Sequence, residues 1–341
     1  MQPAKTIYID PSSTAYYKNK LFDINDSHLN RDDTLMPFVR LREALHKQGH
    51  SIETADYLFE SANKNKCDYY SFGVLSNYKQ LQNNPSITLK AFVIFEPPVV
   101  QPELYQALPE LTSMFELVYV HNTHGDGYSL KGVNAEKLRK FHWPQPRKEV
   151  IESIWSTQPR SQRIVVINGH HVPRKVPNEL YSKRIEVMAS LAKYGVVDLY
   201  GRGWDRWWSR ASMWLPYWKH RKALMSIYHG ACESKYPVLG LYDYSLCFEN
   251  MAMKGYVTEK IFDCIYAGTI PIYLGASDIA DLIPEDVYID FRTFNSISDL
   301  VNNIRAMTEN EKNQKREAGR FFLESNKFIN NYYNSPLSVF G

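Results

Sequence analysis

Residues 244–275 read YSLCFENMAMKGYVTEKIFDCIYAGTIPIYLG, and the order of apolar and polar residues in this stretch decides the fold. The apolar runs at its two ends are typical of strands, and the run YVTEKIFDCIYAG between them predicts a helix with Thr258 as its N-cap. A strand, a helix and a second strand in this order form one unit of a parallel α/β sheet. The polar residues after the first strand are therefore expected at the carboxyl edge of that sheet, where nucleotides bind.

The polar residues of this stretch have the chemistry that a sugar nucleotide requires. Glu249 and Asn250 end the first predicted strand, whereas Glu259 and Lys260 lie in the first turn of the predicted helix. Backbone N–H groups and the helix dipole favour a phosphate at such a turn. A neighbouring acid and lysine can bind the ribose hydroxyls and the diphosphate leaving group. The alternative is a solvated first turn in which the dipole merely favours an acid, but the pattern around the pair favours the functional interpretation.

The stretch resembles the signature of the α1,3-fucosyltransferases of glycosyltransferase family 10. That family carries the pattern FEN…Y-x-TEK…G-x-x-P-x-x-x-G, and every letter of it is present here. The resemblance implies an α/β fold of GT-B type, in which two Rossmann-like, doubly wound domains face each other across a cleft. It also implies an inverting transferase that moves L-fucose from GDP-β-L-fucose to a hydroxyl of GlcNAc or glucose in an oligosaccharide or lipid-linked glycan.

The resemblance also implies which residues bind the donor. Arg184 corresponds to the family's phosphate-binding arginine. Lys260 and Tyr256 are expected at the phosphates and Glu259 at the ribose. Arg202, in the turn after the strand VVDLYG, is a weaker candidate for the phosphate or the base. The expected substrate-binding set is Arg184, Arg202, Glu249, Asn250, Tyr256, Glu259 and Lys260.

Two departures from the family pattern keep the donor sugar open. Ser245 stands where many relatives have an aromatic residue, and PEDVYIDF at residues 284–291 replaces the usual P-x-SFI run. The first alternative is therefore the same chemistry with another nucleotide-linked deoxy- or amino-sugar donor. Two alternatives come from other classes: a GT-B sugar-nucleotide epimerase, and a glycan-binding protein with a degenerate site. The intact candidate residues argue against the degenerate site.

Glu96 is the predicted catalytic base. Inverting transfer needs a group that removes the proton of the acceptor hydroxyl as the donor's C1 loses its diphosphate. Glu96 ends an apolar strand in VIFEPPVV, and the resemblance implies a base in a Glu-x-Pro context, which Glu96 and Pro98 match. The alternative for this acid is a solvated loop carboxylate. The loop HNTHGDGYSLKG at residues 121–132 supplies further acceptor-side candidates, which are His121, His124 and the reserve base Asp126.

The length and the internal composition of the chain predict two domains. A chain of 341 residues is too long for one ordinary core. Prolines and charges concentrate in residues 141–162. We therefore expect a Rossmann-like acceptor-binding domain over residues 1–150 and a Rossmann-like nucleotide-sugar-binding domain with C-terminal helices over residues 151–341. In the second domain, Asn178 is the predicted N-cap of a helix that ends at Gly195.

Composition narrows the class of protein further. A net charge of +3 is nearly neutral and argues against a nucleic-acid partner. No apolar run approaches the ~20 residues of a membrane helix, and the start lacks a signal peptide's hydrophobic region, so a cytoplasmic location is expected. The four cysteines form no CxxC pair and are expected to be reduced structural thiols. No metal motif is evident, so we expect no required cofactor and a divalent metal that is at most stimulatory.

Residues 204–222 are unusually rich in basic residues and contain five tryptophans. Helical spacing up to Pro216 predicts a short amphipathic helix that ends there. The residues at this spacing are Trp204, Trp207, Trp208, Ala211 and Leu215. The simplest interpretation is that this helix packs on the second domain. The functional interpretation is peripheral contact with the inner face of a membrane that carries anionic lipid or a lipid-linked glycan, and the aromatic faces could also stack on acceptor sugars.

Overall fold

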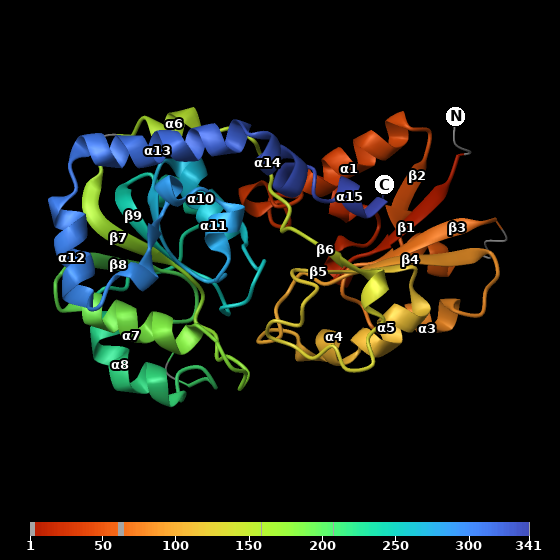
Figure 1. Ribbon diagram of the computed structural model, residues 1–341, viewed down its shortest axis with the longest axis horizontal. Coiled ribbons are helices and arrows are strands. Elements are labelled where there is room, and N and C mark those ends of the chain that lie inside the picture. Colours follow the sequence, from red (N-terminus) through yellow and green to blue (C-terminus); the bar gives the residue numbers. More distant parts are fainter. Residues whose placement is uncertain (1–3, 61–64, 158, 207, 341) are drawn as a thin grey trace. The chain divides into compact units, whose positions relative to one another are not determined.

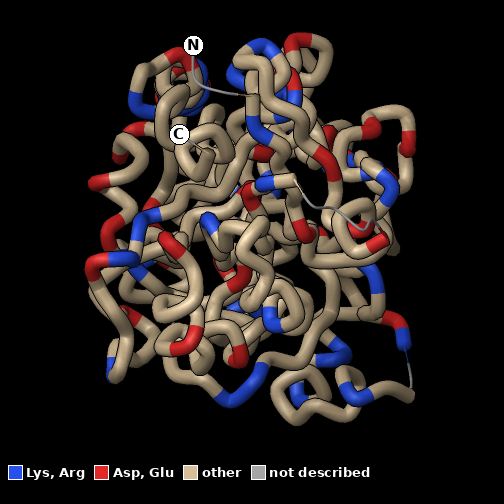
Figure 2. The backbone as a smooth tube through the Cα atoms, turned by 90° about the vertical axis from the view of Figure 1, so that its right-hand side faces the viewer, with Lys and Arg blue, Asp and Glu red and all other residues tan. Residues whose placement is uncertain are grey.

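The computed structural model describes residues 4–60, 65–157, 159–206 and 208–340. The chain divides into two compact units (Figure 1). Unit 1 contains residues 1–147 and 330–341, and unit 2 contains residues 148–329. Basic and acidic residues are interspersed along the trace (Figure 2), as the small net charge of +3 suggests.

Unit 1 is a six-stranded parallel sheet with the strand order β2-β1-β3-β4-β5-β6. The strands are β1 Thr6–Asp10, β2 Ser51–Thr54, β3 Cys67–Ser71, β4 Ile87–Val93, β5 Leu117–Val120 and β6 Leu138–Lys140. The helices are α1 Met36–Lys47, α2 Asp56–Glu60, α3 Tyr78–Leu81, α4 Pro102–Gln106 and α5 Leu108–Met114.

Each face of this sheet has its own apolar core, because side chains alternate across a strand. Tyr69 belongs to the core under α4 and α5, whereas its neighbour Tyr70 belongs to the core under α1. Phe92 and Val93 divide in the same way. Both faces are thus covered by helices (Figure 1), which is the usual arrangement for a parallel sheet.

The last residues of the chain pack on unit 1, although they were predicted to belong to the C-terminal domain. Helix α15, Leu337–Phe340, lies against the α1 side of the sheet (Figure 1), where Val339 is buried. The ring of Phe340 stacks on Tyr70 with centroids 4.1 Å apart. The prediction assigned the C-terminal helices to the second domain, but the apolar side chains of α15 belong to the core of unit 1. The first boundary between units falls between Arg147 and Lys148, close to the expected residue 150.

Unit 2 is a five-stranded parallel sheet with the order β11-β10-β9-β7-β8. The strands are β7 Ser161–Ile167, β8 Val197–Tyr200, β9 Tyr242–Phe248, β10 Ile270–Leu274 and β11 Ile289–Asp290. Helices α7 Tyr181–Ala192 and α8 Leu215–Met225 cover one face, whereas α6 Glu152–Trp155, α10 Glu259–Ala267 and α13 Glu309–Glu324 cover the other (Figure 1). Shorter or peripheral helices are α9 Lys235–Leu239, α11 Ile279–Leu282, α12 Ile297–Ala306 and α14 Asn326–Phe328.

The topology of unit 2 defines where a ligand can bind. The chain leaves β7 toward β8 on one side and then returns to β9 on the other. The order of strands therefore reverses between β7 and β9. In open α/β sheets, such a switch point leaves a crevice outside the carboxyl ends of the two strands.

Two local predictions in unit 2 need correction. Asn178 is not a helix cap, because it adopts a left-handed conformation with φ of 63°. The carboxylate of Glu179 instead accepts the N–H of Ser182 at 3.1 Å at the start of α7. Asn178 has another role, since its carbonyl accepts the N–H of Ala252 at 2.8 Å. Asparagine adopts the left-handed conformation more readily than most residues, which explains its presence here. The asparagine therefore marks a turn before the helix, whereas the predicted role as N-cap was wrong.

The predicted tryptophan-rich helix also differs from the structure. The described residues between 204 and 214 form turns and bends, and α8 starts at Leu215, where the prediction ends a helix. Pro216 lies in the first turn of α8, where its missing N–H costs nothing. Trp204 is buried, as the packing interpretation expected, whereas Trp208 is 88% exposed. The predicted position Trp207 lies outside the described residues.

A buried ion cluster fixes α13 to the sheet of unit 2. Asp243, in β9, binds the ammonium of Lys312 at 2.8 Å and the guanidinium of Arg316 at 2.5 Å. All three side chains are buried. Arg316 also donates to the carbonyl of Gly268, the residue at which α10 ends. One carboxylate thus connects a strand, the end of one helix and the face of another.

Removing this carboxylate should destabilise unit 2. Asp243→Ala leaves the buried Arg316 without its carboxylate and leaves the buried Lys312 with only the exposed Glu309 as an ion-pair partner. This should lower the free energy of unfolding by about 3–5 kcal/mol. Urea denaturation followed by tryptophan fluorescence measures this, because six of the seven tryptophans belong to unit 2. Asp281→Ala, which removes an exposed acid, is the control and should change stability by less than about 1 kcal/mol. Equal urea midpoints for the two variants would contradict the prediction.

Candidate functional site

The buried carboxylate of Glu249 is the centre of the candidate donor site in unit 2. Glu249 follows the end of β9 and is fully buried. Its Oε1 accepts the backbone N–H of Thr258 at 2.8 Å, and its Oε2 accepts the Thr258 hydroxyl at 2.8 Å. The ammonium of Lys260 lies 3.2 Å from the same Oε2. Glu249 was predicted to reach the crevice as a binding residue, but this geometry makes it a positioning residue for the start of α10.

Thr258 occupies the predicted N-cap position of α10, but its side chain does not cap the helix. The hydroxyl donates to Glu249 and accepts from the Lys260 ammonium at 2.9 Å. The N–H groups of the first turn are therefore not satisfied by the Thr258 side chain, as an ordinary cap residue would do. This helix start, with its favourable dipole, remains suited to an anion.

Lys260 and Glu259 are held as an ion pair at this helix start. The ammonium of Lys260 lies 3.5 Å from the Glu259 carboxylate. Desolvation lowers the pKa of Lys260, but the charges of Glu249 and Glu259 outweigh it and the net shift is upward. Desolvation raises the pKa of Glu259, but the charges of Lys260 and Lys235 outweigh this effect and the pKa falls to about 2. Both groups are therefore ionised at neutral pH, as the predicted roles require.

Arg184 is brought to the same strand end from the opposite face of the sheet. It lies in α7 and is 3% exposed. Its guanidinium donates to the carbonyls of Phe248 at 2.6 Å and Glu249 at 2.9 Å. Both partners are neutral oxygens, and its Nε has no hydrogen-bond partner among the described residues. Desolvation lowers the pKa of Arg184. Because its Nε makes no hydrogen bond among the described residues, the buried guanidinium keeps a donor available for a further partner.

The loop between β9 and α10 is fixed from two sides. The N–H of Leu180 donates to the carbonyl of Asn250 at 3.0 Å, which docks the start of α7 on this loop. On the other side, the N–H of Gly255 donates to Asp278 at 2.9 Å. The amide of Asn250 lies 3.4 Å from the hydroxyl of Tyr256, so these two predicted binding residues are adjacent. Tyr256 is buried and Asn250 is half-buried.

Arg202 lies in the loop after β8, beside the loop after β7. Its carbonyl accepts the N–H of His170 at 3.0 Å, and its side chain is exposed. The two loops touch because residue 201 is a glycine: a Cβ there would lie 1.9 Å from the carbonyl oxygen of Asn168. His170 itself packs between rings, 4.5 Å from that of Trp204. Its position indicates packing rather than contact with the donor.

A small cavity of about 60 Å³ marks the switch point between β7 and β9. Glu259, Lys260 and Ser245 contribute to its lining, together with Asn168 at the end of β7. Ser245, which the sequence analysis singled out as a departure from the family pattern, thus lies at this cavity. The cavity lining also includes Cys247 and Cys264, whose free thiols lie 3.2 Å apart.

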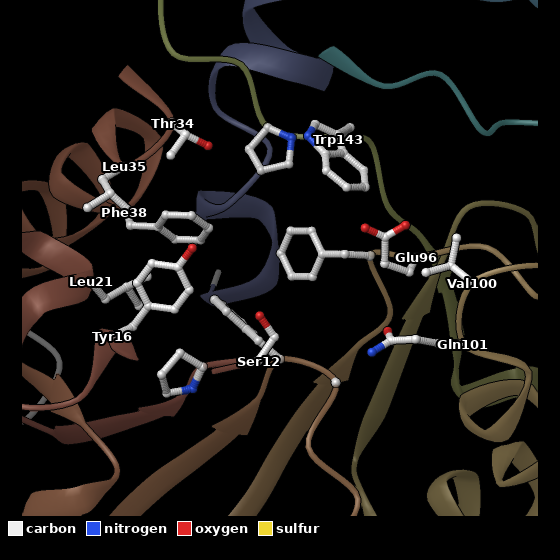
Figure 3. A pocket seen from close by; sticks show the side chains of 15 residues that line it. Ser12, Tyr16, Leu21, Thr34, Leu35, Phe38, Glu96, Val100, Gln101 and Trp143 are labelled. Carbon is white, nitrogen blue, oxygen red and sulfur yellow. The ribbon is translucent and has the colours of Figure 1, made fainter. Parts of the chain in front are cut away.

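Unit 1 contains a larger pocket, with a volume of about 430 Å³, at the carboxyl edge of its sheet (Figure 3). It is lined by the segments that follow β1, β3, β4 and β6, because the ends of parallel strands meet at one edge. Figure 3 shows Glu96 on the side of the pocket that carries Trp143, Val100 and Gln101, opposite Tyr16 and Phe38. Apolar and aromatic walls with a few polar groups are typical of small-molecule sites.

Of the four acceptor-side candidates predicted from the sequence, Glu96 is the one that lines this pocket. It is half-buried and follows the end of β4, and its carbonyl accepts the hydroxyl of Tyr105 at 3.1 Å. His121 is fully buried and its Nε2 lies 2.6 Å from the carbonyl of Phe95. Burial lowers the pKa of His121 to about 4, so its imidazole is neutral. His121 supports the pocket wall from behind, since its ring is stacked on that of Trp143.

His124 and Asp126 belong to the loop after β5 and are not among the residues that line this pocket. Asn122 organises the loop: its side-chain oxygen accepts the N–H of Asp126 at 3.0 Å, and its amide donates to the Asp126 carbonyl. His124 is exposed and Asp126 is half-buried. The structure thus separates Glu96 from the two other candidates by position.

Sequence reasoning missed Asp10, the last residue of β1 and a direct neighbour of the pocket residue Pro11. Asp10 is fully buried and accepts hydrogen bonds from Tyr69 at 2.5 Å, Asn77 at 3.0 Å and Tyr17 at 3.1 Å. Burial raises its pKa. An acid at the end of an apolar strand was the available signal, the same one that identified Glu96. The network fixes the segment that carries the pocket residue Tyr16.

The described residues contain no group of three or more His, Cys, Asp and Glu side chains arranged to hold a metal ion. Within the same residues, no helix is both long and apolar enough to cross a lipid bilayer.

Two parallel α/β units, one with a charged site at its switch point, define a GT-B fold, as predicted. A solved structure described as an α1,3-fucosyltransferase with GDP superimposes with a TM-score of 0.54 at 13% identity, covering 99% of this chain and 89% of that one. The structure of TarM superimposes with a TM-score of 0.55 at 13% identity, covering 84% and 57% of the two chains. Likeness at this identity concerns the fold alone.

Sequence comparison relates the second half of the chain to a known family. Residues 170–317 match the model described as "Glycosyltransferase family 10 (fucosyltransferase) C-term". An α-(1,4)-fucosyltransferase of Arabidopsis thaliana is 38% identical over 66 residues, or 19% of this chain and 16% of the relative. The α-(1,3)-fucosyltransferase FucT of Helicobacter pylori is 27% identical over 107 residues, or 31% and 20%. Residues 170–317 are thus similar to the C-terminal domain of the family 10 fucosyltransferases. The matches to these two relatives span about a fifth or less of the relatives' length.

Two of the buried histidines, His121 and His170, predict that the free energy of unfolding falls as the pH falls. Burial lowers the pKa of both His121 and His170 to about 4, whereas an unfolded histidine titrates near 6.5. Between these values the unfolded chain binds protons that the folded chain does not. Each histidine should therefore reduce the free energy of unfolding by up to about 1.4 kcal/mol per pH unit as the pH falls from about 6.5 to about 4.

Melting temperatures measured from pH 7.5 to pH 5 test this. His170→Phe keeps a ring between Trp204 and Tyr217 but cannot titrate, so the melting temperature of this variant should fall less steeply with pH than that of the wild type. His28→Phe, which replaces an exposed histidine, should leave the slope unchanged. Parallel pH profiles for all three proteins would show that His170 is not held neutral.

Proposed function

We propose that the chain is an inverting glycosyltransferase that transfers L-fucose from GDP-β-L-fucose to a GlcNAc or glucose hydroxyl of an oligosaccharide or lipid-linked glycan. The observation that carries the proposal is the pair of cations, Arg184 and Lys260, at the switch point of a family 10 domain. The α1,3-fucosyltransferase of similar fold was solved with GDP, which supports a guanine nucleotide here.

On the donor side, each group has a role that its environment supports. Arg184 offers a buried positive charge whose protein partners are carbonyls, so an anion can be its counter-charge. Lys260 lies beside the first turn of α10, where the helix dipole adds to its charge. Together they would stabilise the diphosphate as it leaves. Glu259 stays ionised and can accept hydrogen bonds from the ribose hydroxyls.

On the acceptor side, we propose that the pocket of unit 1 binds the acceptor and that Glu96 is the base. The pocket has aromatic walls that can cover the apolar face of a sugar ring, and Glu96 is its acid. The proton of the attacking hydroxyl would pass to the Glu96 carboxylate as the new C1–O bond forms and the C1–O bond to the diphosphate breaks. Asp126 remains the reserve base.

A second donor remains a specific alternative. Ser245 lines the switch-point cavity, so the space left by the missing aromatic ring could accommodate another nucleotide-linked deoxy- or amino-sugar. An epimerase would convert the sugar nucleotide without any acceptor, so incubation of the donor alone distinguishes the two classes. We also propose that the reaction needs no metal and takes place in the cytoplasm, at the inner face of the membrane when the acceptor is lipid-linked.

GDP should bind unit 2 and stabilise it. Binding to the folded state alone should add about 2.7 kcal/mol to the free energy of unfolding at a hundredfold excess over Kd. Lys260→Ala should reduce this shift and lower kcat by about 10²–10³ with EDTA present or absent. Lys183→Ala, which removes an exposed cation next to Arg184 on α7, is the matched control and should behave as the wild type. A melting shift with UDP or dTDP but none with GDP would rule out GDP-fucose as the donor.

Replacing the proposed base should separate catalysis from donor binding. Glu96→Gln keeps the shape of the side chain but cannot take up the acceptor proton, so kcat should fall by about 10²–10⁴. The melting shift with GDP should remain, because Glu96 belongs to unit 1. Asp126→Asn, made in parallel, should cost much less. If Asp126→Asn abolishes transfer and Glu96→Gln does not, the base is Asp126, and if neither slows transfer, unit 1 does not supply it.

A further inference from the structure

Unit 2 carries a concentrated set of exposed apolar side chains outside the donor site. Four large apolar residues within 11 positions are mostly exposed: Trp208 at 88%, Met213 at 65%, Leu215 at 73% and Trp218 at 60%. Elsewhere in the described residues, exposed apolar side chains of this size are scattered singly. Single exposed apolar residues are normal, but a cluster marks a surface that binds something.

Helix α8 presents two different faces. Tyr217 and Leu224 are buried in the core of unit 2, where α8 packs against α7 (Figure 1). The exposed residues Leu215, Trp218, Lys219 and Lys222 follow the spacing i, i+3, i+4 and i+7. Residues at this spacing lie on one side of a helix. The outer side of α8 is therefore apolar in its first turn and basic in its later turns.

The charge of this region is strongly positive. Residues 204–222 contain five arginines and lysines and one acid, while the whole chain has a net charge of only +3. Arg206 and Arg210 flank Trp208 and are exposed, as are Lys219 and Lys222 beside Trp218. Basic residues thus alternate with the exposed apolar ones on the same segment.

We propose that this surface, made of Trp208, Met213, Leu215, Trp218, Lys219 and Lys222, docks on a lipid bilayer that contains anionic lipid. Tryptophan is enriched at the boundary between headgroups and acyl chains. Lysine can bury its methylene chain there while its ammonium reaches the headgroups. Anionic headgroups complement the positive charge of the lysines and arginines. A helix of this kind lies in the interface with its apolar residues inserted.

The combination of charge and exposed apolar side chains selects this partner over others. A polyanion such as nucleic acid would use the arginines and lysines but would leave Met213 and Leu215 in water. A second copy of this chain would bring like charges together at the contact. A bilayer with anionic headgroups satisfies both properties at once. This inference can be tested apart from the proposed reaction, because vesicles without donor and without lipid-linked glycan measure membrane binding alone.

Cosedimentation of the full chain with vesicles tests the proposal. The probes are vesicles of phosphatidylcholine alone and vesicles with a third of phosphatidylserine. We expect binding to the anionic vesicles, weakened by salt, and little binding to the neutral ones. Lys219→Glu with Lys222→Glu should weaken binding at least tenfold, because two attractive charges become repulsive. Trp208→Ser with Trp218→Ser should weaken it by a similar factor.

Matched variants make the result specific. Phe321→Ser removes an exposed apolar residue on α13, and Lys47→Glu with Lys193→Glu reverses two exposed charges outside residues 204–222. Both should bind vesicles as the wild type does, and all variants should keep the melting temperature, since the replaced side chains are exposed. Equal binding to neutral vesicles, full binding by the tryptophan variant, or no binding would overturn the proposal. Concentration-dependent dimerisation abolished by the tryptophan substitutions would assign the surface to self-association instead.

Discussion

The fully buried carboxylate of Glu249 is the constraint on which the donor site depends. It connects the end of β9 to the start of α10 through Thr258 and Lys260, and the same segment receives the guanidinium of Arg184 from α7. The last glycine of the signature has its explanation here. A Cβ at Gly275 would lie 2.4 Å from the Tyr273 hydroxyl and 2.6 Å from the Cγ of Glu249, so a glycine lets the chain after β10 pass beside both side chains. Several residues of the signature, such as Gly275 and Thr258, thus pack around the buried Glu249 carboxylate, and this packing does not require a ligand.

This arrangement resolves a conflict between burial and charge. A lone buried carboxylate would be strongly unfavourable, but Glu249 is satisfied by an N–H, a hydroxyl and an ammonium. In return it fixes the Lys260 ammonium before any ligand arrives. A preorganised cation needs no reorganisation when charge develops on a leaving group, which is the property that makes such sites effective.

Much of the fold could be predicted from the sequence, because strands and helices in unit 2 have clear apolar periods. The helix starting at Glu259 and the strands on either side of it are where the pattern indicated. The errors arose where local pattern and tertiary packing disagree. Pro216 begins a helix instead of ending one, and Glu249 faces inward although an acid at a strand end usually faces solvent. The sequence predicted Glu96 but not the pocket around it, because the walls of the pocket come from segments that lie far apart in the sequence.

The return of residues 330–341 to unit 1 has a consequence for how the protein is made. Leu337, Val339 and Phe340 complete a core whose other members lie before residue 148. All of unit 2 is encoded between these two parts of the core. On the ribosome, the first sheet therefore emerges with an unfilled gap and keeps it until unit 2 has been synthesised. Domains usually fold in the order in which they emerge. Here the second unit can reach its final structure first, and the first unit is finished last.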